Sequence, residues 1–240
     1  MSNTSLGKGK KGSKFWMGTV LEYPKLEKDI NALLGQDVSW FSPLPKENYR
    51  EYEMKQKGDL LGLKQDEIQK LFSFWPSRQP QWDGIAVGNN NQTLFLIEAK
   101  AHLKELNSKC MSKNPNSKGK IRCAMKTVHD TYYKKADFGL WMEEYYQLAN
   151  RLTFYHMIKD MIKRQDIKAF DDIKLVLLNF ANDFTYKPKD IVTWRDYMSF
   201  VFEKMTGFKG TPEGVLDLFI DVGKYSDAFK RTAEGKWILK

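Results

Sequence analysis

The sequence has very little cysteine, and this scarcity excludes several kinds of site. Only Cys110 and Cys123 are present in 240 residues. Two cysteines are too few for a disulfide framework or for a four-cysteine zinc or iron–sulfur site. Histidine is scarce as well, and His129 and His156 have no partner at the spacing of metal ligands. The composition therefore favours a protein of the reducing cytosol, and we expect a cytoplasmic location.

Long apolar runs are also missing. No run approaches the roughly 18 to 20 residues that a membrane-spanning helix needs, and the N-terminus lacks the apolar core of a secretory signal. We therefore expect neither a membrane protein nor a secreted one. The sequence contains no G-x-S-x-G elbow, no H-E-x-x-H helix and no paired C-x-x-C motif, so a serine hydrolase, a zincin and a zinc ribbon receive no support.

The composition is typical of a soluble globular protein and contains more basic than acidic residues. Hydrophobic residues make up 42% and charged residues 29%, and the length suffices for one domain with a sizeable core. Lys and Arg exceed Asp and Glu by 39 to 30, and this surplus favours a polyanionic partner. Four lysines and no acid lie within residues 1–14, so we expect a flexible basic arm there and a single domain over residues 15–240.

Hydrophobic periodicity predicts strands that alternate with helices. We expect an α/β fold in which helices cover a mixed sheet on both sides. The predicted helices are residues 26–34, ended by Gly35, then 47–74 with a break near Gly58, 139–164 and 191–205. The predicted strands are residues 82–87, 93–99, 173–180 and 215–222, and the predicted loops are residues 40–45 and a basic loop over residues 104–126.

The strands 82–87 and 93–99 read as a hairpin that carries acidic residues at its open end. Asp83 begins the first strand, and the run Glu98-Ala99-Lys100 ends the second. If Gly88 pairs with residue 93, opposite residue numbers sum to 181, so Asp83 faces Glu98. Because side chains alternate along a strand, Lys100 then shares the face of Glu98, whereas a one-residue slip would separate the two acids.

This pattern of residues suits metal-assisted phosphodiester chemistry. Opposed carboxylates destabilise a hairpin by up to about 1 kcal/mol, and a bound cation removes that repulsion. Mg²⁺ prefers oxygen ligands and usually takes one or two protein carboxylates, so we expect Mg²⁺, or Mn²⁺ in its place. A Lys100 ammonium beside the ion could orient the attacking water or stabilise charge on phosphorus. The plainer alternative is a solvated ion pair between Glu98 and Lys100 at a strand end.

The motifs QWDG and IEAK resemble the signature of the PD-(D/E)XK nuclease superfamily, in which an Asp begins one strand and Glu-x-Lys ends the next. The segments FWP, WDG, IEAKAH, YYQLANRL and NFANDF look like an uncharacterised bacterial family within it, over residues 70–185. The resemblance implies a restriction-endonuclease-like core and a nuclease that acts on DNA. It also implies that Asp83, Glu98 and the Ala99 carbonyl hold the metal while Lys100 assists the water.

The resemblance also implies a further glutamate on the helix before the hairpin as a metal contact. Glu51, Glu53 and Glu67 compete for this role, and we prefer Glu51, which sits in a cluster of aromatic residues. For each of the three, the alternative is a solvated helix glutamate.

The long helix after the hairpin supplies two more candidates. RecB-like members of the superfamily carry a Gln and, four residues later, a Tyr; this chain has Gln147, but Arg151 stands in the tyrosine position. Gln147 and Arg151 share one helix face, where an amide and a guanidinium could hold a metal-bound water or a phosphate. His102 would share the face of Lys100 if the strand continues.

The basic loop begins beside the proposed site, so its cations are candidates for contacts with nucleic acid. They are Lys104, Lys109, Lys113, Lys118, Lys120, Arg122 and Lys126, with Arg151 from the long helix. A solvated loop without a ligand is the alternative. The leading hypothesis is thus a Mg²⁺-dependent DNA nuclease. The alternatives are a catalytically silent nuclease-fold protein that binds nucleic acid or a protein partner, and a phosphoryl hydrolase of small nucleotides, which would need an enclosed pocket.

Overall fold

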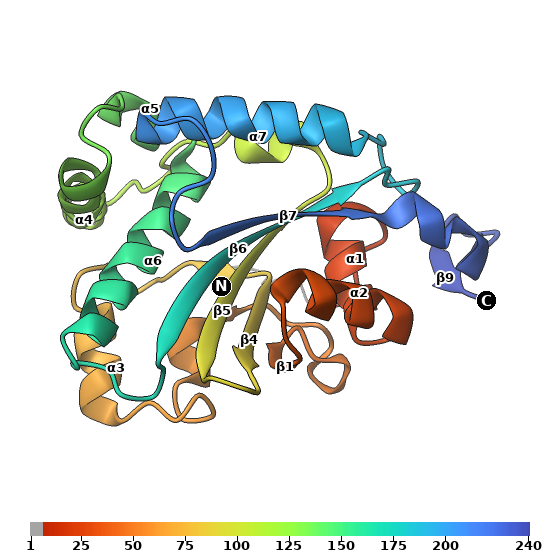
Figure 1. Ribbon diagram of the computed structural model, residues 1–240, viewed down its shortest axis with the longest axis horizontal. Coiled ribbons are helices and arrows are strands. Elements are labelled where there is room, and N and C mark those ends of the chain that lie inside the picture. The colour runs from red at the N-terminus through yellow and green to blue at the C-terminus, as the bar shows by residue number, and fades with distance from the viewer. Residues whose placement is uncertain (1–6) are drawn as a thin grey trace.

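The computed structural model describes residues 7–240 and is built around a mixed five-stranded sheet of order β1–β4–β5–β6–β7 (Figure 1). The strands are β1 (Val38–Ser42), β4 (Gly84–Gly88), β5 (Thr93–Lys100), β6 (Asp172–Ala181) and β7 (Val215–Asp221). Pairing is antiparallel between β1, β4 and β5 and parallel between β5, β6 and β7. The predicted α/β class with a mixed sheet is confirmed.

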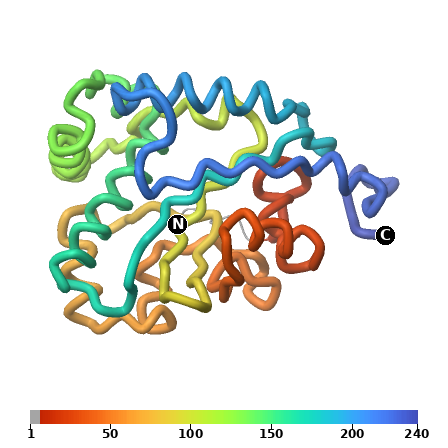
Figure 2. Tube along the Cα trace, in the orientation of Figure 1, coloured from red at the N-terminus to blue at the C-terminus, as the bar shows by residue number. Residues whose placement is uncertain are grey.

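Helices cover both faces of this sheet, as predicted (Figures 1 and 2). One face carries α1 (Gly12–Val20) and α2 (Pro24–Leu34). The other carries α3 (Gln65–Phe72), α4 (Pro115–Tyr132), α5 (Phe138–Glu143), α6 (Tyr146–Lys163) and α7 (Ile191–Thr206). Alternate residues of β5 enter the two separate cores: Leu94 and Leu96 pack on the α6 side, and Phe95 and Ile97 on the α1 side. A strand buried on both faces reads as a continuous apolar run for this reason.

Short elements complete the chain outside the main sheet. β2 (Tyr52–Glu53) pairs with β3 (Gln81–Trp82), and β8 (Phe229–Arg231) pairs with β9 (Trp237–Leu239). Four 3-10 turns, at Pro45–Glu47, Met54–Lys57, Leu103–Leu106 and Val222–Ala228, connect the larger elements. Within residues 7–240, no helix has both the length and the apolar character needed to cross a membrane.

The first predicted helix is confirmed, and its physical signals are visible in α2. Leu26, Ile30 and Leu34 are buried along one stripe, and Pro24 lies in the first turn. Gly35 follows the last helical residue with φ of 77°, a left-handed conformation that glycine adopts at little cost.

The helix predicted over residues 47–74 is wrong except at its end. Only α3 is an α-helix there, and the preceding residues form β2 and 3-10 turns. Gly62 has φ of 74°, which interrupts a helix, while the buried Leu61 and Leu63 enter the core from an irregular segment. Leucine spacing therefore reflected burial rather than helical periodicity. The loop predicted over residues 40–45 is also corrected, because β1 continues to Ser42.

The basic loop predicted over residues 104–126 is wrong in its second half, which belongs to α4. The start of α4 carries ordinary helix signals: the Asn114 side chain accepts a hydrogen bond from the Ser117 N–H at 2.9 Å, and Pro115 is the first helical residue. The buried Ile121 and Met125 then form an apolar stripe. The helix predicted over residues 139–164 is divided, because α5 ends at residue 143 and α6 begins at residue 146.

The N-terminal boundary also needs correction. α1 begins at Gly12, so the end of the predicted arm at residue 14 falls inside a helix, and residues 1–6 lie outside the described part of the chain. Trp16 is fully buried in α1, where its indole Nε1 donates a hydrogen bond to Asp183 Oδ1 at 2.9 Å. Its ring contacts Phe15 and Phe180. These contacts attach α1 to the sheet.

We predict that Trp16→Ala lowers the free energy of unfolding by about 3–5 kcal/mol, the range for deleting a buried large aromatic side chain. Urea denaturation measures this change, and Leu60→Ala, at a side chain that is 65% exposed, is the matched control. A change for Trp16→Ala no larger than that of the control would show that α1 does not pack on the sheet.

Candidate active site

The register of the β4–β5 hairpin is the one predicted. Gly84 pairs with Ile97, and every other pair in the ladder has the same residue-number sum of 181. Asp83 lies in a bend between β3 and β4, at the level of Glu98 on the neighbouring strand. Its Oδ2 accepts a hydrogen bond from the Ala99 N–H at 2.8 Å. The two acids thus lie at the same end of the hairpin.

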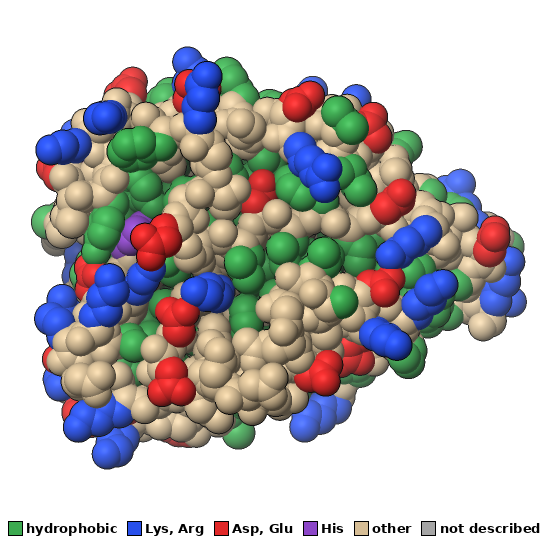
Figure 3. Space-filling view, in the orientation of Figure 1, with side chains coloured by type: hydrophobic (Ala, Val, Ile, Leu, Met, Phe, Trp, Pro, Cys, Tyr) green, Lys and Arg blue, Asp and Glu red, His purple; other side chains and the backbone are tan. Residues whose placement is uncertain are grey.

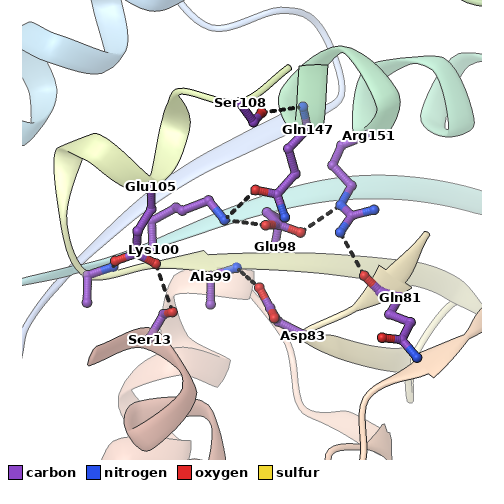
Figure 4. A network of polar contacts seen from close by, with 11 residues as sticks. Ser13, Gln81, Asp83, Glu98, Ala99, Lys100, Glu105, Ser108, Gln147 and Arg151 are labelled. Carbon is purple, nitrogen blue, oxygen red and sulfur yellow. Dashed lines mark hydrogen bonds and ion pairs between the residues drawn. The ribbon is translucent and has the colours of Figure 1, made fainter. Parts of the chain in front are cut away.

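Glu98 is buried and forms ion pairs with both neighbouring cations (Figure 4). Its Oε1 accepts a hydrogen bond from Lys100 Nζ, and its Oε2 accepts one from Arg151 Nε at 2.6 Å. Glu98 is only 2% exposed, so the ion pair with Lys100 is not the solvated strand-end pair of the plainer alternative. A buried carboxylate requires compensation of this kind.

The shared face of Gln147 and Arg151 on α6 is confirmed, and it points toward the sheet. Gln147 Oε1 accepts a second hydrogen bond from Lys100 Nζ at 3.1 Å. Arg151 Nη2 donates to the Gln81 carbonyl at 2.7 Å, and its guanidinium lies over the Trp82 ring at 4.4 Å from the centroid. The Glu98 and Lys100 side chains are therefore held from above by α6.

The ion pairs give Glu98 and Lys100 opposite charges at neutral pH. Burial acts to raise the pKa of Glu98, but Arg151 and Lys100 outweigh it, and the pKa lies below its usual value. Burial likewise acts to lower the pKa of Lys100, but the charges of Glu98 and Asp83 outweigh it and raise that pKa. Lys100 is therefore an ammonium group that can donate hydrogen bonds but cannot serve as a base.

The carboxylates of Asp83 and Glu51 have fewer cations in close contact than the Glu98 carboxylate. Burial, with the charges of Glu98 and Glu51, raises the pKa of Asp83 to about 8, against the opposing charge of Lys100. Burial also raises the pKa of Glu51, with Lys14 opposing and Glu98 adding to the effect. Burial is the largest cause for both acids, and a cation bound beside them would favour their ionised forms.

The oxygen atoms at this end of the hairpin suit a small hard cation. Within residues 7–240, no group of three or more His, Cys, Asp or Glu side chains is placed to hold a metal. Asp83 and Glu98 provide two carboxylates, however, which is the usual number for Mg²⁺. The Ala99 carbonyl points to the same side as the Ala99 N–H that meets Asp83, because both backbone groups of a strand residue face one neighbour. These oxygens are donors of the type that Mg²⁺ takes, and both Glu98 oxygens are engaged by Lys100 and Arg151 in this structure.

The three upstream glutamates have different surroundings. Glu67 is buried and structural, because its two oxygens accept hydrogen bonds from the Lys64 and Lys168 N–H groups, each at 2.7 Å. Glu53 pairs with Lys55 at 2.9 Å. The charge of Glu51 acts to raise the pKa of Asp83, and the charge of Glu98 acts to raise the pKa of Glu51, although Glu51 precedes β2 rather than lying on a helix.

Two contacts near the site were not foreseen from the sequence. Glu105 accepts hydrogen bonds from Ser13 Oγ at 3.0 Å and from the Ala101 N–H at 3.2 Å, so it joins α1 to the end of β5. Ser108 Oγ accepts a hydrogen bond from the Gln147 N–H at 2.8 Å and fixes the first turn of α6. The sequence offered one reason to single out Glu105, because it is the only acid in the basic segment over residues 104–126. It offered no reason to single out Ser108.

Arg151 was predicted to contact nucleic acid, but it does not offer an accessible cation. Its side chain is buried and bonded to Glu98 and to the Gln81 carbonyl. A phosphate could reach its guanidinium only if these contacts opened. His102 contacts Tyr186 and accepts a hydrogen bond from the Lys104 N–H, and these contacts give it no role at the acid pair.

The remaining basic candidates are exposed and divided between two elements. Lys104, Lys109 and Lys113 lie in the segment after β5, and Lys118, Lys120, Arg122 and Lys126 lie on α4. Arg122 and Lys126 lie over the Phe138 ring, and Lys126 also pairs with Asp130. The opposite, buried side of α4 packs against α5 and α6.

No family model, no curated protein and no solved structure matches this chain. The resemblance of the motifs to the nuclease superfamily therefore stays a prediction, and the site rests on its own geometry.

We predict that Asp83→Asn stabilises the metal-free protein increasingly as pH rises from about 4 to about 8. The pKa of Asp83 rises on folding from 3.8 to about 8, so the folded chain keeps a proton that the unfolded chain releases. Wild-type stability is thus lost across that window, whereas the Asn variant loses none through this group. Thermal unfolding in EDTA at about pH 5, 7 and 9 measures the difference. A difference in Tm that is equal at all three pH values would contradict the raised pKa of Asp83.

Proposed function

We propose that this protein is a Mg²⁺-dependent nuclease of the PD-(D/E)XK type, with Mn²⁺ as a substitute ion, that hydrolyses phosphodiester bonds in DNA. The observation that carries the proposal is the hairpin register, which brings Asp83 to the level of Glu98, while strand alternation sets Lys100 on the face of Glu98. A one-residue slip of the register would separate the two acids.

The architecture supports the same proposal. The antiparallel β4–β5 hairpin is followed by α4, α5 and α6 and then by the parallel strand β6, and helices cover both faces of the sheet. This order of elements supports the restriction-endonuclease-like core that the motifs imply. Because one fold hosts many activities, the acids and the lysine carry more weight than the fold.

Each residue of the site has a separate role in the proposed reaction. Asp83, Glu98 and the Ala99 carbonyl would hold the ion, with Glu51 close enough to act on it by charge. A bound Mg²⁺ supplies Lewis-acid polarisation of the phosphate and a water of lowered pKa. Lys100 donates hydrogen bonds to the attacking water or to the phosphate oxygens, where negative charge develops.

The α6 residues position this machinery. Gln147 fixes the Lys100 ammonium through Oε1, so the lysine keeps a defined direction. For Glu98 to offer an oxygen to an ion, one of its two cationic contacts must open. Arg151 keeps a second bond, to the Gln81 carbonyl, that would retain it beside the site after such a movement.

A hydrolase of small nucleotides receives less support at this site. The cavity that Glu98 and Lys100 line with Gln147 and Asn179 has a volume of about 10 Å³. This is close to the space of a single water and far below that of a nucleotide.

We predict metal-dependent cleavage of DNA by the purified protein, assayed on linear, nicked and single-stranded substrates with Mg²⁺ or Mn²⁺. EDTA should abolish it. Asp83→Asn, Glu98→Gln and Lys100→Met should each lower the rate by more than about 100-fold, because each removes a ligand or a charge that acts on the transition state.

Asp66→Asn and Lys46→Met are the matched controls, because both side chains are exposed and lie outside the site. They should leave the rate unchanged. The absence of cleavage, together with salt-sensitive DNA binding that all variants retain, would overturn the nuclease proposal and support the silent nuclease-fold alternative.

A further inference from the structure

A second cavity lies on a different side of α6. Its volume is about 340 Å³, within the range of small-molecule pockets, and it is enclosed by the end of α4, the second half of α6 and residues 206–213, which connect α7 to β7. Lys159 in its wall lies two helical turns beyond Arg151, about 12 Å along the axis of α6. None of the groups that we assign to the nuclease site lines it.

The floor of this cavity is aromatic and uncharged. The Tyr132 ring stacks on the His156 ring with centroids 3.9 Å apart, and the Tyr133 hydroxyl lies 2.6 Å from His156 Nε2. Burial, with the charges of Lys159 and Lys163, lowers the pKa of His156 to about 3, so the imidazole is neutral at physiological pH. A neutral ring nitrogen accepts the hydrogen bond from the Tyr133 hydroxyl.

The rim of the cavity is cationic. Lys159 is engaged with the Tyr155 hydroxyl at 2.9 Å and with Glu213 at 3.4 Å. Lys163 and Lys209 are exposed, and neither forms a salt bridge within the part of the chain that the structure describes. At the left of the face drawn in Figure 3, Lys and Arg side chains lie around a His side chain with acidic and apolar side chains among them, and Glu213 is the acid in the cavity lining. The rim therefore has positive charge to offer an anion.

We propose that this cavity binds a nucleotide, with the base against the aromatic rings and the phosphate at Lys163 and Lys209. Every base has a planar π-face that contacts aromatic side chains, and lysine ammonium groups bind phosphate. Phe208 adds an aromatic wall that is 48% exposed. A neutral apolar ligand would leave the lysines unused, and an inorganic anion would leave the rings unused. The nucleotide is either free or the terminal nucleotide of a strand.

The test is calorimetric titration of the full chain with dAMP in EDTA, where the proposed nuclease reaction does not run. Replacing both Lys163 and Lys209 by Ala should weaken dAMP binding by about tenfold or more, because both phosphate contacts are lost. The matched control replaces Lys134 and Lys168, which are exposed outside the cavity, and makes the same change in net charge. It should leave the affinity unchanged.

Two smaller ligands test the proposed base contacts and the proposed phosphate contacts separately. Adenosine and inorganic phosphate should each bind more weakly than dAMP. Phe208→Ala should weaken dAMP binding but leave phosphate binding unaffected. The Phe208 side chain is 48% exposed, and circular dichroism checks that the variant remains folded. Asp83→Asn should leave dAMP binding intact, so this result and that of the cleavage assay are independent.

A 5′-phosphorylated trinucleotide distinguishes the two sources. If the trinucleotide binds more tightly than dAMP, and the Lys163 and Lys209 changes weaken that binding, the ligand is the end of a strand. If the trinucleotide and dAMP bind equally tightly, the ligand is the free nucleotide. Either result supports the proposal. The absence of binding by both ligands at millimolar concentration, or equal affinities of the cavity variant and its lysine control, would overturn it.

Discussion

The structure depends on the neutralisation of one buried carboxylate. Glu98 lies near the end of β5, the central strand of the sheet, and its charge persists there because Lys100 comes from its own strand and Arg151 from α6. These contacts fix where α6 lies against β5. They also determine which face of the helix meets the sheet and where Gln147 stands. A buried ion pair contributes little net stability, but the loss of one partner is costly, so the arrangement specifies a geometry more than it strengthens the fold.

The two acids of the hairpin are treated differently by their surroundings. Glu98 has two cations in contact, whereas Asp83 has only a backbone N–H, from Ala99, and the more distant charge of Lys100. One carboxylate is therefore stably ionised, while the pKa of the other lies near neutrality. Such a separation of pKa values between neighbouring acids is typical of sites that bind or transfer charge, although structural networks also produce it.

The sequence predicted the parts of the molecule that depend on local rules. The hairpin register follows from strand alternation and loop length, and Gly35 ends α2 because only a left-handed residue fits there. Glu51 illustrates the opposite case. It was chosen as the candidate on a helix that does not exist, and tertiary packing around an irregular segment brings it to the acids. The burial of Arg151 was equally inaccessible, because charge and helix spacing do not reveal what covers a side chain.

The bend at Asp83 has a mechanical consequence. The two residues before it pair with β2, and the five after it pair with β1 and β5, so the chain changes partners at this one position. Asp83 belongs to neither ladder, and its carboxylate turns to the backbone of β5 instead. The position of Asp83 is thus determined by two separate sheets, one on each side of it along the chain. A displacement of the small β2–β3 pair would move this carboxylate and break its hydrogen bond to Ala99, while the β4–β5 ladder kept its own pairing.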